Sequence, residues 1–326
     1  MKTMLKTNRL FLLLFTLTTL MSCTSVSKQL QEDGWLWKIS GNGLTQPSYL
    51  FGTYHGTYDI LYGYVDSIPG FHEAFDTCSQ YAGEVNLLLE DPKSSISKLD
   101  MEMPKDTTYS ILLNNEDYHY LDSIVRQNLK TPFNKMYLKP GHLLLVLEAI
   151  NELEEFSKNG YSKIIIDSIR SQFMDLVLAT KAQEKEYTLV GLETFYEQMN
   201  LLVPNENFKK QADILIADLR EEESAQLPIF SKTLSEVYRT QNMKYLIKFE
   251  ANLDSLYQTS SIFKNMIEQT REVLLKQRNI NWINKIPALM KDKPTFIAVG
   301  VRHLPGKNGL ISLLIKKGYK VEPVGK

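Results

Sequence analysis

Two histidines stand in the same local pattern near opposite ends of the chain. His55 and His303 each follow an apolar stretch, a glycine and two further residues, in the segments YLFGTYH (49–55) and FIAVGVRH (296–303). The chain has five histidines, so two of them share one context. A glycine permits a sharp turn where a strand ends, and the histidine three places on then projects over the sheet edge. In open α/β sheets, ligands bind beyond that edge.

Two glutamates share this geometry. Glu84 lies within or at the end of a strand expected at 81–89, and Glu193 directly follows an apolar stretch at 187–192. A carboxylate inside an apolar strand is costly to bury without a partner. A metal ion held by histidines and glutamates would offset this cost, and such mixed ligands suit Zn, Mn, Fe or Co. A metal so held activates water for hydrolysis.

The same residues also have a structural interpretation. A single G-x-x-H histidine is more often a structural residue, and a glutamate at a strand end is often a helix N-cap or a surface charge. No H-E-x-x-H metal motif and no G-x-S-x-G serine hydrolase motif occurs. Of the other chemically active side chains, we expect His72 and His119 to be exposed, His142 to cap a helix, and Cys78 to be a buried, inert thiol.

The elements that must position the site are short strands separated by helical blocks. Strands are expected at 35–40, 47–52, 81–89, 187–192, 295–300 and 319–324, the first two forming a hairpin around residues 41–43. Helices are expected at 61–75, 141–156, 164–185, throughout about 195–290, and at 309–317. The pattern predicts an α/β or α+β fold with a central sheet and two long helical insertions. The repeated strand–G-x-x-H unit predicts an internal pseudo-duplication.

The N-terminal segment indicates where in the cell the protein is located. Three basic residues precede an apolar run at 10–21, which is too short to span a bilayer and is typical of a signal peptide. The segment 20–23, Leu-Met-Ser-Cys, resembles a bacterial lipobox. That resemblance implies cleavage before Cys23 and its acylation, and Thr24 is compatible with sorting to the outer membrane. The alternative is a plain secretory signal in which Cys23 has no special role.

We therefore expect a signal peptide at 1–22, a polar tether at 23–33 and a folded domain at 34–326. The 326 residues are 43% hydrophobic and 23% charged, which is typical of a globular protein. The 37 Lys and Arg balance 38 Asp and Glu to a net charge of −1. No basic excess predicts a nucleic-acid partner.

Several motifs, taken in order along the chain, resemble the TraB/GumN family. That family is related to the TIKI metalloproteases and, more remotely, to erythromycin-esterase and ChaN-like proteins. The resemblance covers residues 34–324. Its parts are an opening strand pair that ends at His55, Glu84 in Gly83-Glu84-Val85, Met174-Asp175, Gly191-Leu192-Glu193-Thr194 with Gln198, Arg278-Asn279 with Trp282, and a closing segment that contains His303.

The resemblance implies metal-dependent hydrolysis centred on these residues. His55, Glu84 and His303 would hold a divalent metal (Mn, Co or Zn), and Glu193 would act as general base on water. Arg278 would reach the site as an anion stabiliser. Its alternative role is an ion pair with a buried glutamate, and the sequence leaves both interpretations open.

Two positions depart from the family pattern. The family often has an aspartate two residues after the first glutamate, where this chain has Asn86, which puts metal affinity or activity in doubt if that carboxylate takes part. Arg302 stands beside His303 where small residues are common. It would hold a substrate carboxylate or be a solvated charge, and we favour the solvated charge.

The sequence thus predicts a membrane-anchored, extracytoplasmic, metal-dependent hydrolase, most plausibly a peptidase, with a peptide or small molecule as substrate. One alternative is a lipoprotein of the same fold that binds a peptide or another ligand without cutting it. Another is a haem- or metal-binding lipoprotein, by analogy with the ChaN-like proteins. The presence of both histidines and both glutamates favours the enzyme.

Overall fold

The computed structural model describes residues 34–55, 60–89, 100–158, 160, 171–222, 227–256, 268 and 270–325. The expected signal peptide (1–22) and tether (23–33) lie outside the described residues. So do residues 164–170 of the helix expected at 164–185. Among the helices that the structure describes, none is long and apolar enough to cross a membrane.

A mixed six-stranded sheet forms the centre of the fold, with the strand order β4-β3-β5-β2-β1-β6. The strands β4, β3, β5 and β2 run parallel, whereas β1 is antiparallel to both of its neighbours. This arrangement confirms the predicted central sheet and the predicted hairpin of the first two strands. The strands are β1 (Leu36–Ser40), β2 (Ser48–Thr53), β3 (Gln80–Gly83), β4 (Thr188–Gly191), β5 (Thr295–Gly300) and β6 (Lys320–Pro323).

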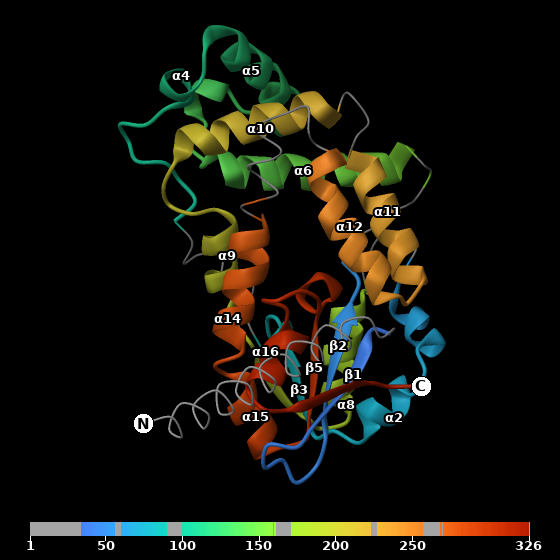
Figure 1. The fold of residues 1–326 in the computed structure, drawn as a ribbon. Helices are drawn as coiled ribbons and strands as arrows, with labels where there is room; N and C mark the ends of the chain where they lie inside the picture. The colour runs from blue at the N-terminus through green and yellow to red at the C-terminus, as the bar shows by residue number, and fades with distance from the viewer. Residues whose placement is uncertain are drawn as a thin grey trace, which may run out of the picture.

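Helices occupy the connections from β3 to β4 and from β4 to β5, which confirms the two predicted helical insertions (Figure 1). The first contains α4 (Tyr109–Leu112), α5 (Asn115–Leu129), η2 (Phe133–Lys135), α6 (Pro140–Lys158) and α8 (Met174–Glu184). The second contains α9 (Phe195–Leu202), α10 (Phe208–Glu222), α11 (Leu227–Arg239), α12 (Met243–Leu256), the π-helix η3 (Thr270–Gln277), α14 (Arg278–Trp282) and α15 (Ile286–Asp292). After β5 come η4 (Val301–His303) and α16 (Leu310–Lys316).

Two predicted elements have different bounds in the structure. The strand expected at 81–89 ends at Gly83, because the Asn86 side chain accepts hydrogen bonds from the backbone N–H groups two and three residues on and turns the chain. The helix expected at 61–75 is divided into η1 (Tyr62–Ser67) and α2 (Phe71–Asp76). Gly70 separates them with a φ of 71°, which a glycine adopts without strain.

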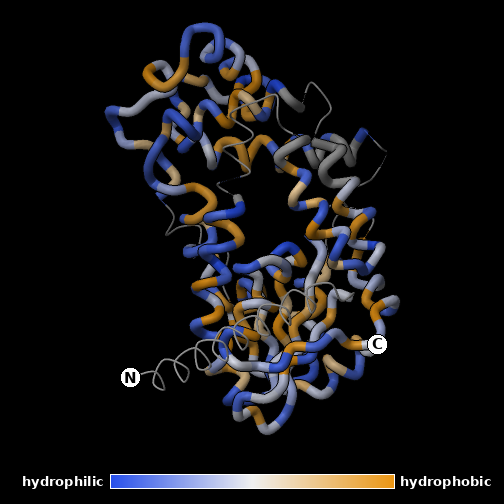
Figure 2. The backbone as a smooth tube through the Cα atoms, in the orientation of Figure 1, coloured by the Kyte–Doolittle hydropathy of each residue, from blue (hydrophilic) through white to orange (hydrophobic). Residues whose placement is uncertain are grey.

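The residues that the structure describes form two hydrophobic cores. The larger one surrounds the sheet, and the smaller one joins α4, α5, α6 and α10, which we call the helical lobe. The helical lobe lies away from the sheet (Figure 1). In the region between the lobe and the sheet, α9 and η3 lie on one side, and α11 and α12 lie on the other side. Hydrophobic residues gather in the strands and along the inner turns of these helices (Figure 2). Both insertions therefore contribute to the space above the sheet edge.

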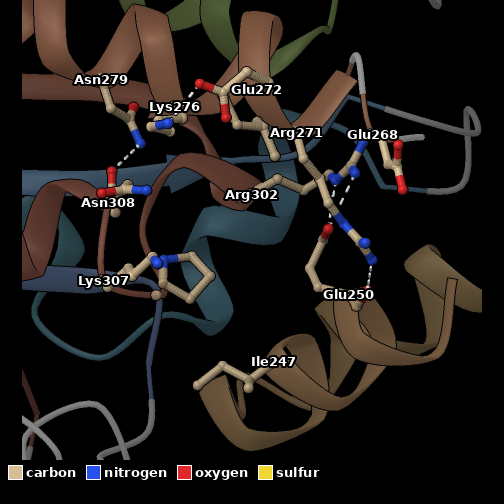
Figure 3. A pocket seen from close by; sticks show the side chains of 14 residues that line it. Ile247, Glu250, Glu268, Arg271, Glu272, Lys276, Asn279, Arg302, Lys307 and Asn308 are labelled. Carbon is tan, nitrogen blue, oxygen red and sulfur yellow. Dashed lines mark hydrogen bonds and ion pairs between the residues drawn. The ribbon is translucent and has the colours of Figure 1, made fainter. Parts of the chain in front are cut away.

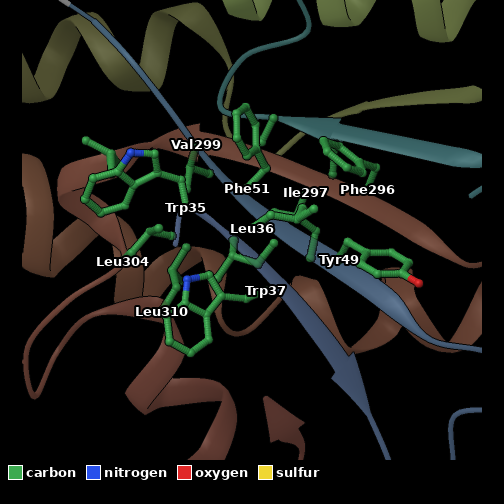
Figure 4. Packing of buried hydrophobic residues seen from close by; sticks show 14 of the residues in the cluster. Trp35, Leu36, Trp37, Tyr49, Phe51, Phe296, Ile297, Val299, Leu304 and Leu310 are labelled. Carbon is green, nitrogen blue, oxygen red and sulfur yellow. The ribbon is translucent and has the colours of Figure 1, made fainter. Parts of the chain in front are cut away.

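Aromatic packing fixes α2 and the central strands. Phe51 of β2 and Phe296 of β5 pack against Phe71 of α2, with ring centroids 4.9 and 5.5 Å from it (Figure 4). Each buried phenylalanine contributes about 1.5–3 kcal/mol through removal of its apolar surface from water. On β2, a Cβ at Gly52 would lie 2.9 Å from Val301 Cγ2 and 3.1 Å from Val301 Cα, so a side chain there would push η4 away from the strand. The last residues of β2 are thereby held against η4.

The two strand–G-x-x-H units are parallel neighbours in the sheet, with Thr53 of β2 paired to Gly300 of β5. Beyond the strands they differ. His303 ends the short helix η4 and is buried, whereas His55 follows β2 outside any helix and is exposed. The predicted pseudo-duplication is therefore not confirmed.

Candidate active site

The four predicted site residues lie at one edge of the sheet, beyond the carboxyl ends of the four parallel strands. Glu84 directly follows β3, His55 and Glu193 come two residues after β2 and β4, and His303 is the third residue after β5. The strands β2 and β5 are direct neighbours, as we predicted for the two histidines. Parallel strands place their carboxyl ends together, which is why residues up to 248 positions apart meet there.

Glu84 is 9% exposed and is held by protein donors on both oxygens. Its Oε1 accepts a hydrogen bond from the Gly300 N–H at 2.8 Å, and its Oε2 accepts one from Arg278 Nη2 at 2.5 Å. Burial alone would raise the pKa of Glu84. Its neighbours His303, His55 and Arg278 and the Gly300 N–H outweigh burial and lower that pKa to about 2. Glu84 is therefore ionised at neutral pH.

Glu193 is 6% exposed and lies on the other side of the same guanidinium group. Its Oε1 accepts from Arg278 Nε at 2.9 Å and Nη2 at 2.6 Å, and its Oε2 accepts from Trp282 Nε1 at 3.2 Å. Gln198 Nε2 donates to Oε1 at 3.2 Å. Burial raises the pKa of Glu193, and the bonds to Arg278 and Trp282 oppose this rise without cancelling it. The pKa values of the two glutamates are thus shifted in opposite directions, downward for Glu84 and upward for Glu193.

Arg278 joins the two glutamates, so the structure contains the ion pair that was one of its two predicted roles. Its guanidinium carbon also lies 4.6 Å from the centre of the Trp282 ring, and Nη1 donates to the Leu274 carbonyl at 3.3 Å. Burial lowers the pKa of Arg278, but the two glutamates raise it by more, so the group stays positive. A permanent cation therefore lies between the two carboxylates.

His303 is neutral and presents a lone pair to Glu84 and Arg278. The Asn279 amide nitrogen donates to two backbone carbonyls, so its oxygen is the acceptor for the His303 Nδ1–H at 2.7 Å. The tautomer thus assigned leaves Nε2 unprotonated, 3.3 Å from Arg278 Nη1 and 3.6 Å from Glu84 Oε1. Burial lowers the pKa of His303 to about 3, although Glu84 opposes this shift.

His55 is bound to a residue to which the sequence assigned no role. Its Nε2 lies 2.7 Å from Asp175 Oδ2 and 3.0 Å from Thr53 Oγ1, and the Thr53 hydroxyl donates to Asp175 Oδ1 at 3.1 Å. Burial lowers the pKa of His55, but the charge of Asp175 and its hydrogen bond outweigh burial and raise it to about 9. Half of the side chain is exposed. Below that pKa both ring nitrogens of His55 carry a proton, and the Nε2–H donates to Asp175.

Gly300 leaves room where His55 and Glu84 face each other. A Cβ at this position would lie 3.4 Å from Glu84 Oε1 and 3.5 Å from His55 Nδ1. Any side chain at residue 300 would therefore extend into the space beside these two donor atoms. The glycine of the second G-x-x-H has a role in the site beyond the turn that we predicted for it.

The donor set suits a divalent metal by its chemistry. The His303 Nε2 lone pair, the ionised Glu84 and the His55 Nδ1 side lie around the space that Gly300 leaves open. Each histidine has its other nitrogen on a carboxylate or amide oxygen, an arrangement that is typical of metal ligands. As placed, no group of three or more His, Cys, Asp or Glu side chains among the described residues is arranged to hold a metal. Arg278 supplies the positive charge between the glutamates.

Two predictions about the neighbours of the site are wrong. Arg302 is not a solvated charge: its side chain is 20% exposed and pairs with Glu250 at 2.5 Å. His142 does not cap its helix, since it lies inside α6, is buried, and has no hydrogen-bond partner for either ring nitrogen among the described residues. Asn86, at the position of the family's aspartate, hydrogen bonds to its own loop.

Three other predictions are confirmed. His72 and His119 are exposed, and His72 pairs with Asp66. Cys78 is buried and unbridged, and burial raises the pKa of its thiol to about 12. None of these three side chains reaches the candidate site through a described contact.

A cavity of about 500 Å³ is lined by Asn279 and Arg302, the first a hydrogen-bond partner of His303 and the second its chain neighbour. Its wall contains the Arg302–Glu250 ion pair and Lys276, which pairs with Glu272 (Figure 3). This cavity, which we call the charged cavity, has ion-paired side chains of both signs in its lining, together with apolar residues such as Ile247 and Leu275. Arg302 therefore lines it while already bound to a protein carboxylate.

The sheet and its edge site define an α/β protein with a buried, polar cluster of His, Glu and Arg. The TraB/PrgY/gumN family matches residues 35–323, and the chain belongs to this family. It is 22% identical to Metalloprotease TIKI1 and 24% identical to Metalloprotease TIKI2, both from Danio rerio, over 92% of this chain. The chain spans 65% and 62% of the length of those two relatives. No solved structure matches the chain.

Proposed function

We propose that the protein is a metal-dependent hydrolase that cuts peptides outside the cytoplasm, held at a bacterial outer membrane by acylated Cys23. One observation carries the catalytic part. The unprotonated Nε2 of a neutral His303 lies 3.6 Å from Oε1 of an ionised Glu84, beyond the carboxyl ends of the parallel strands. The names of the two distant relatives support the same reaction class.

In this proposal His55, Glu84 and His303 hold the metal (Mn, Co or Zn). The metal, when bound, supplies Lewis acidity and an activated water. Glu193 is the general base, because it is a carboxylate beside the metal-holding residues, and burial raises its pKa, which makes it a stronger base than an exposed glutamate. Asp175 and Asn279 orient the two imidazoles. Arg278 offsets negative charge at the reacting centre.

Glutamine substitutions separate the two glutamates by role. Glu193→Gln should abolish peptide hydrolysis and keep bound metal, whereas Glu84→Gln, His55→Ala and His303→Ala should lose both. Metal content and hydrolysis of a peptide library are measured side by side, with Mn²⁺, Co²⁺ and Zn²⁺ each supplied. Wild-type activity in all four variants would refute the mechanism.

A non-catalytic binding protein is the second candidate. The observation in its favour is that Arg278 already pairs with both carboxylates, which leaves neither free in this conformation. This candidate expects a wild-type protein that binds no metal and cuts no peptide in the library but retains a peptide on a column.

A further inference from the structure

A second cavity, of about 460 Å³, lies between the helical lobe and the elements that carry the candidate site. Most of its walls are apolar side chains from α6, α9, α10 and η3, among them Leu145, Leu201, Leu202, Ile214, Val273 and Leu274. The polar side chains of Glu148, Glu206, Asn207, Lys210 and Gln211 also line it. We call it the apolar cavity. Its volume is within the range of ligand-binding pockets, about 300–1,000 Å³. Leu202 is 40% exposed, so the cavity reaches the surface at the end of α9.

Helix periodicity places lining residues of the apolar cavity one turn away from two residues that contact the glutamates, Gln198 and Arg278. On α9, Gln198 contacts Glu193, and Leu201 and Leu202 lie three and four residues further along the same face. On the side of η3 and α14, Leu274 lies four residues before Arg278, and its carbonyl accepts from the Arg278 guanidinium. The helices α9 and η3 also contact each other. Both therefore lead from the glutamates to the same cavity.

The π-helix η3 separates two unlike cavities. Val273 and Leu274 line the apolar cavity, whereas Glu272 and Lys276 line the charged cavity. A π-helix is rare and is frequent at functional sites. An extended ligand that lies over the glutamates thus meets a recess lined by ion pairs on one side of η3, and a recess lined mainly by leucine, isoleucine and valine side chains on the other side.

We propose that the apolar cavity binds an apolar side chain, of leucine to phenylalanine size, of a peptide substrate. This inference rests on the proposed function. Because the lining residues adjoin Gln198 and Arg278 along their helices, the bound side chain belongs to a residue close to the bond that is cut. The lining side chains offer shape and apolar surface, so the cavity should select a substrate side chain by its size and apolar character rather than by its exact identity.

The test compares two matched arginine substitutions in the full chain. Leu202→Arg puts a charge at the mouth of the apolar cavity, and Ile247→Arg, also at a partly exposed apolar residue, does the same at the charged cavity. Leu145→Trp fills the apolar cavity without adding charge. Binding of acetyl-Leu-Leu-amide, acetyl-Ser-Ser-amide and dodecanoate is followed by saturation-transfer NMR in the Glu193→Gln background, where hydrolysis is absent by design.

Saturation transfer to the leucine methyl groups should be strong in the parent and in Ile247→Arg, and lost in Leu202→Arg and Leu145→Trp. For hydrolysed peptides, the same two variants should lower kcat/KM about 10–100-fold when leucine occupies the bound position, and leave it unchanged for serine. Equal saturation transfer to the leucine peptide in Leu202→Arg and Ile247→Arg would overturn the inference. Saturation transfer to dodecanoate but not to the leucine peptide would also overturn it. Leucine-specific binding in a protein that cuts no peptide would uphold the cavity and refute the hydrolase.

Discussion

Replacement of Arg278 by glutamine removes the positive charge between the two glutamates. The three hydrogen bonds from Arg278 to the glutamates, at 2.5, 2.6 and 2.9 Å, disappear. The carboxylates of Glu84 and Glu193, which are 9% and 6% exposed, lose their cation. Breaking a buried ion pair by removal of one partner costs about 3–5 kcal/mol. We expect Arg278→Gln to lower the free energy of unfolding by this amount at pH 7.

The loss should depend on pH in a defined direction. In the wild type the pKa of Glu84 is lowered to about 2, so its contribution is present above the unfolded value and is lost as the pH falls toward 2. Without Arg278, Glu84 loses one of the contributions that lower its pKa, and the pKa of Glu193, which burial already raises, rises further. The penalty for Glu193 is therefore full at pH 7 and shrinks as the pH falls toward 5, because its carboxyl group becomes protonated.

Urea denaturation at pH 7 and pH 5, followed by circular dichroism, measures both effects. Arg126→Gln is the matched control, since Arg126 pairs with Asp122 in an exposed i, i+4 pair that water screens, so its loss should change the stability little. Addition of Glu193→Gln to Arg278→Gln should restore part of the stability, and Mn²⁺ should stabilise Arg278→Gln more than the wild type. A loss below about 1 kcal/mol at pH 7, or an equal loss at both pH values, would refute the ion-pair reasoning.

Three further substitutions test the surroundings of the site and the anchor. Asn279→Ala leaves the Nδ1–H of His303 buried without its acceptor, so stability should fall by about 1–3 kcal/mol and metal affinity about 10–100-fold; urea denaturation and calorimetry measure these, and unchanged values would contradict the role. Asp175→Asn should lower the pKa of His55 from about 9 toward 6.5, which NMR titration follows; a value that stays near 9 would contradict the assignment. Cys23→Ala should release the protein from the membrane pellet, and a cleaved variant that still pellets would refute the lipid anchor.

Local sequence patterns were enough to predict the strands and the edge of the sheet at which the candidate site lies. The apolar runs before Gly52 and Gly300 are long enough for one strand each, and a glycine with a following histidine marks where each run ends. The strand that contains Tyr81 was predicted too long, since the apolar run continues past Gly83. The Asn86 side chain turns the backbone there, a local effect that hydrophobic periodicity does not register.

The sequence by itself determined which residue types stand at the ends of the strands, because strand length, turn residues and periodicity depend on neighbours a few positions apart. The partner of each side chain was decided by the tertiary structure. Arg278 meets glutamates 194 and 85 positions away, and His55 meets Asp175 across 120 positions. These contacts exist because α8 and the η3–α14 segment pack over the sheet edge, and no local pattern specifies where a distant helix docks. The protonation of each imidazole, and the cation between the glutamates, follow from that packing alone.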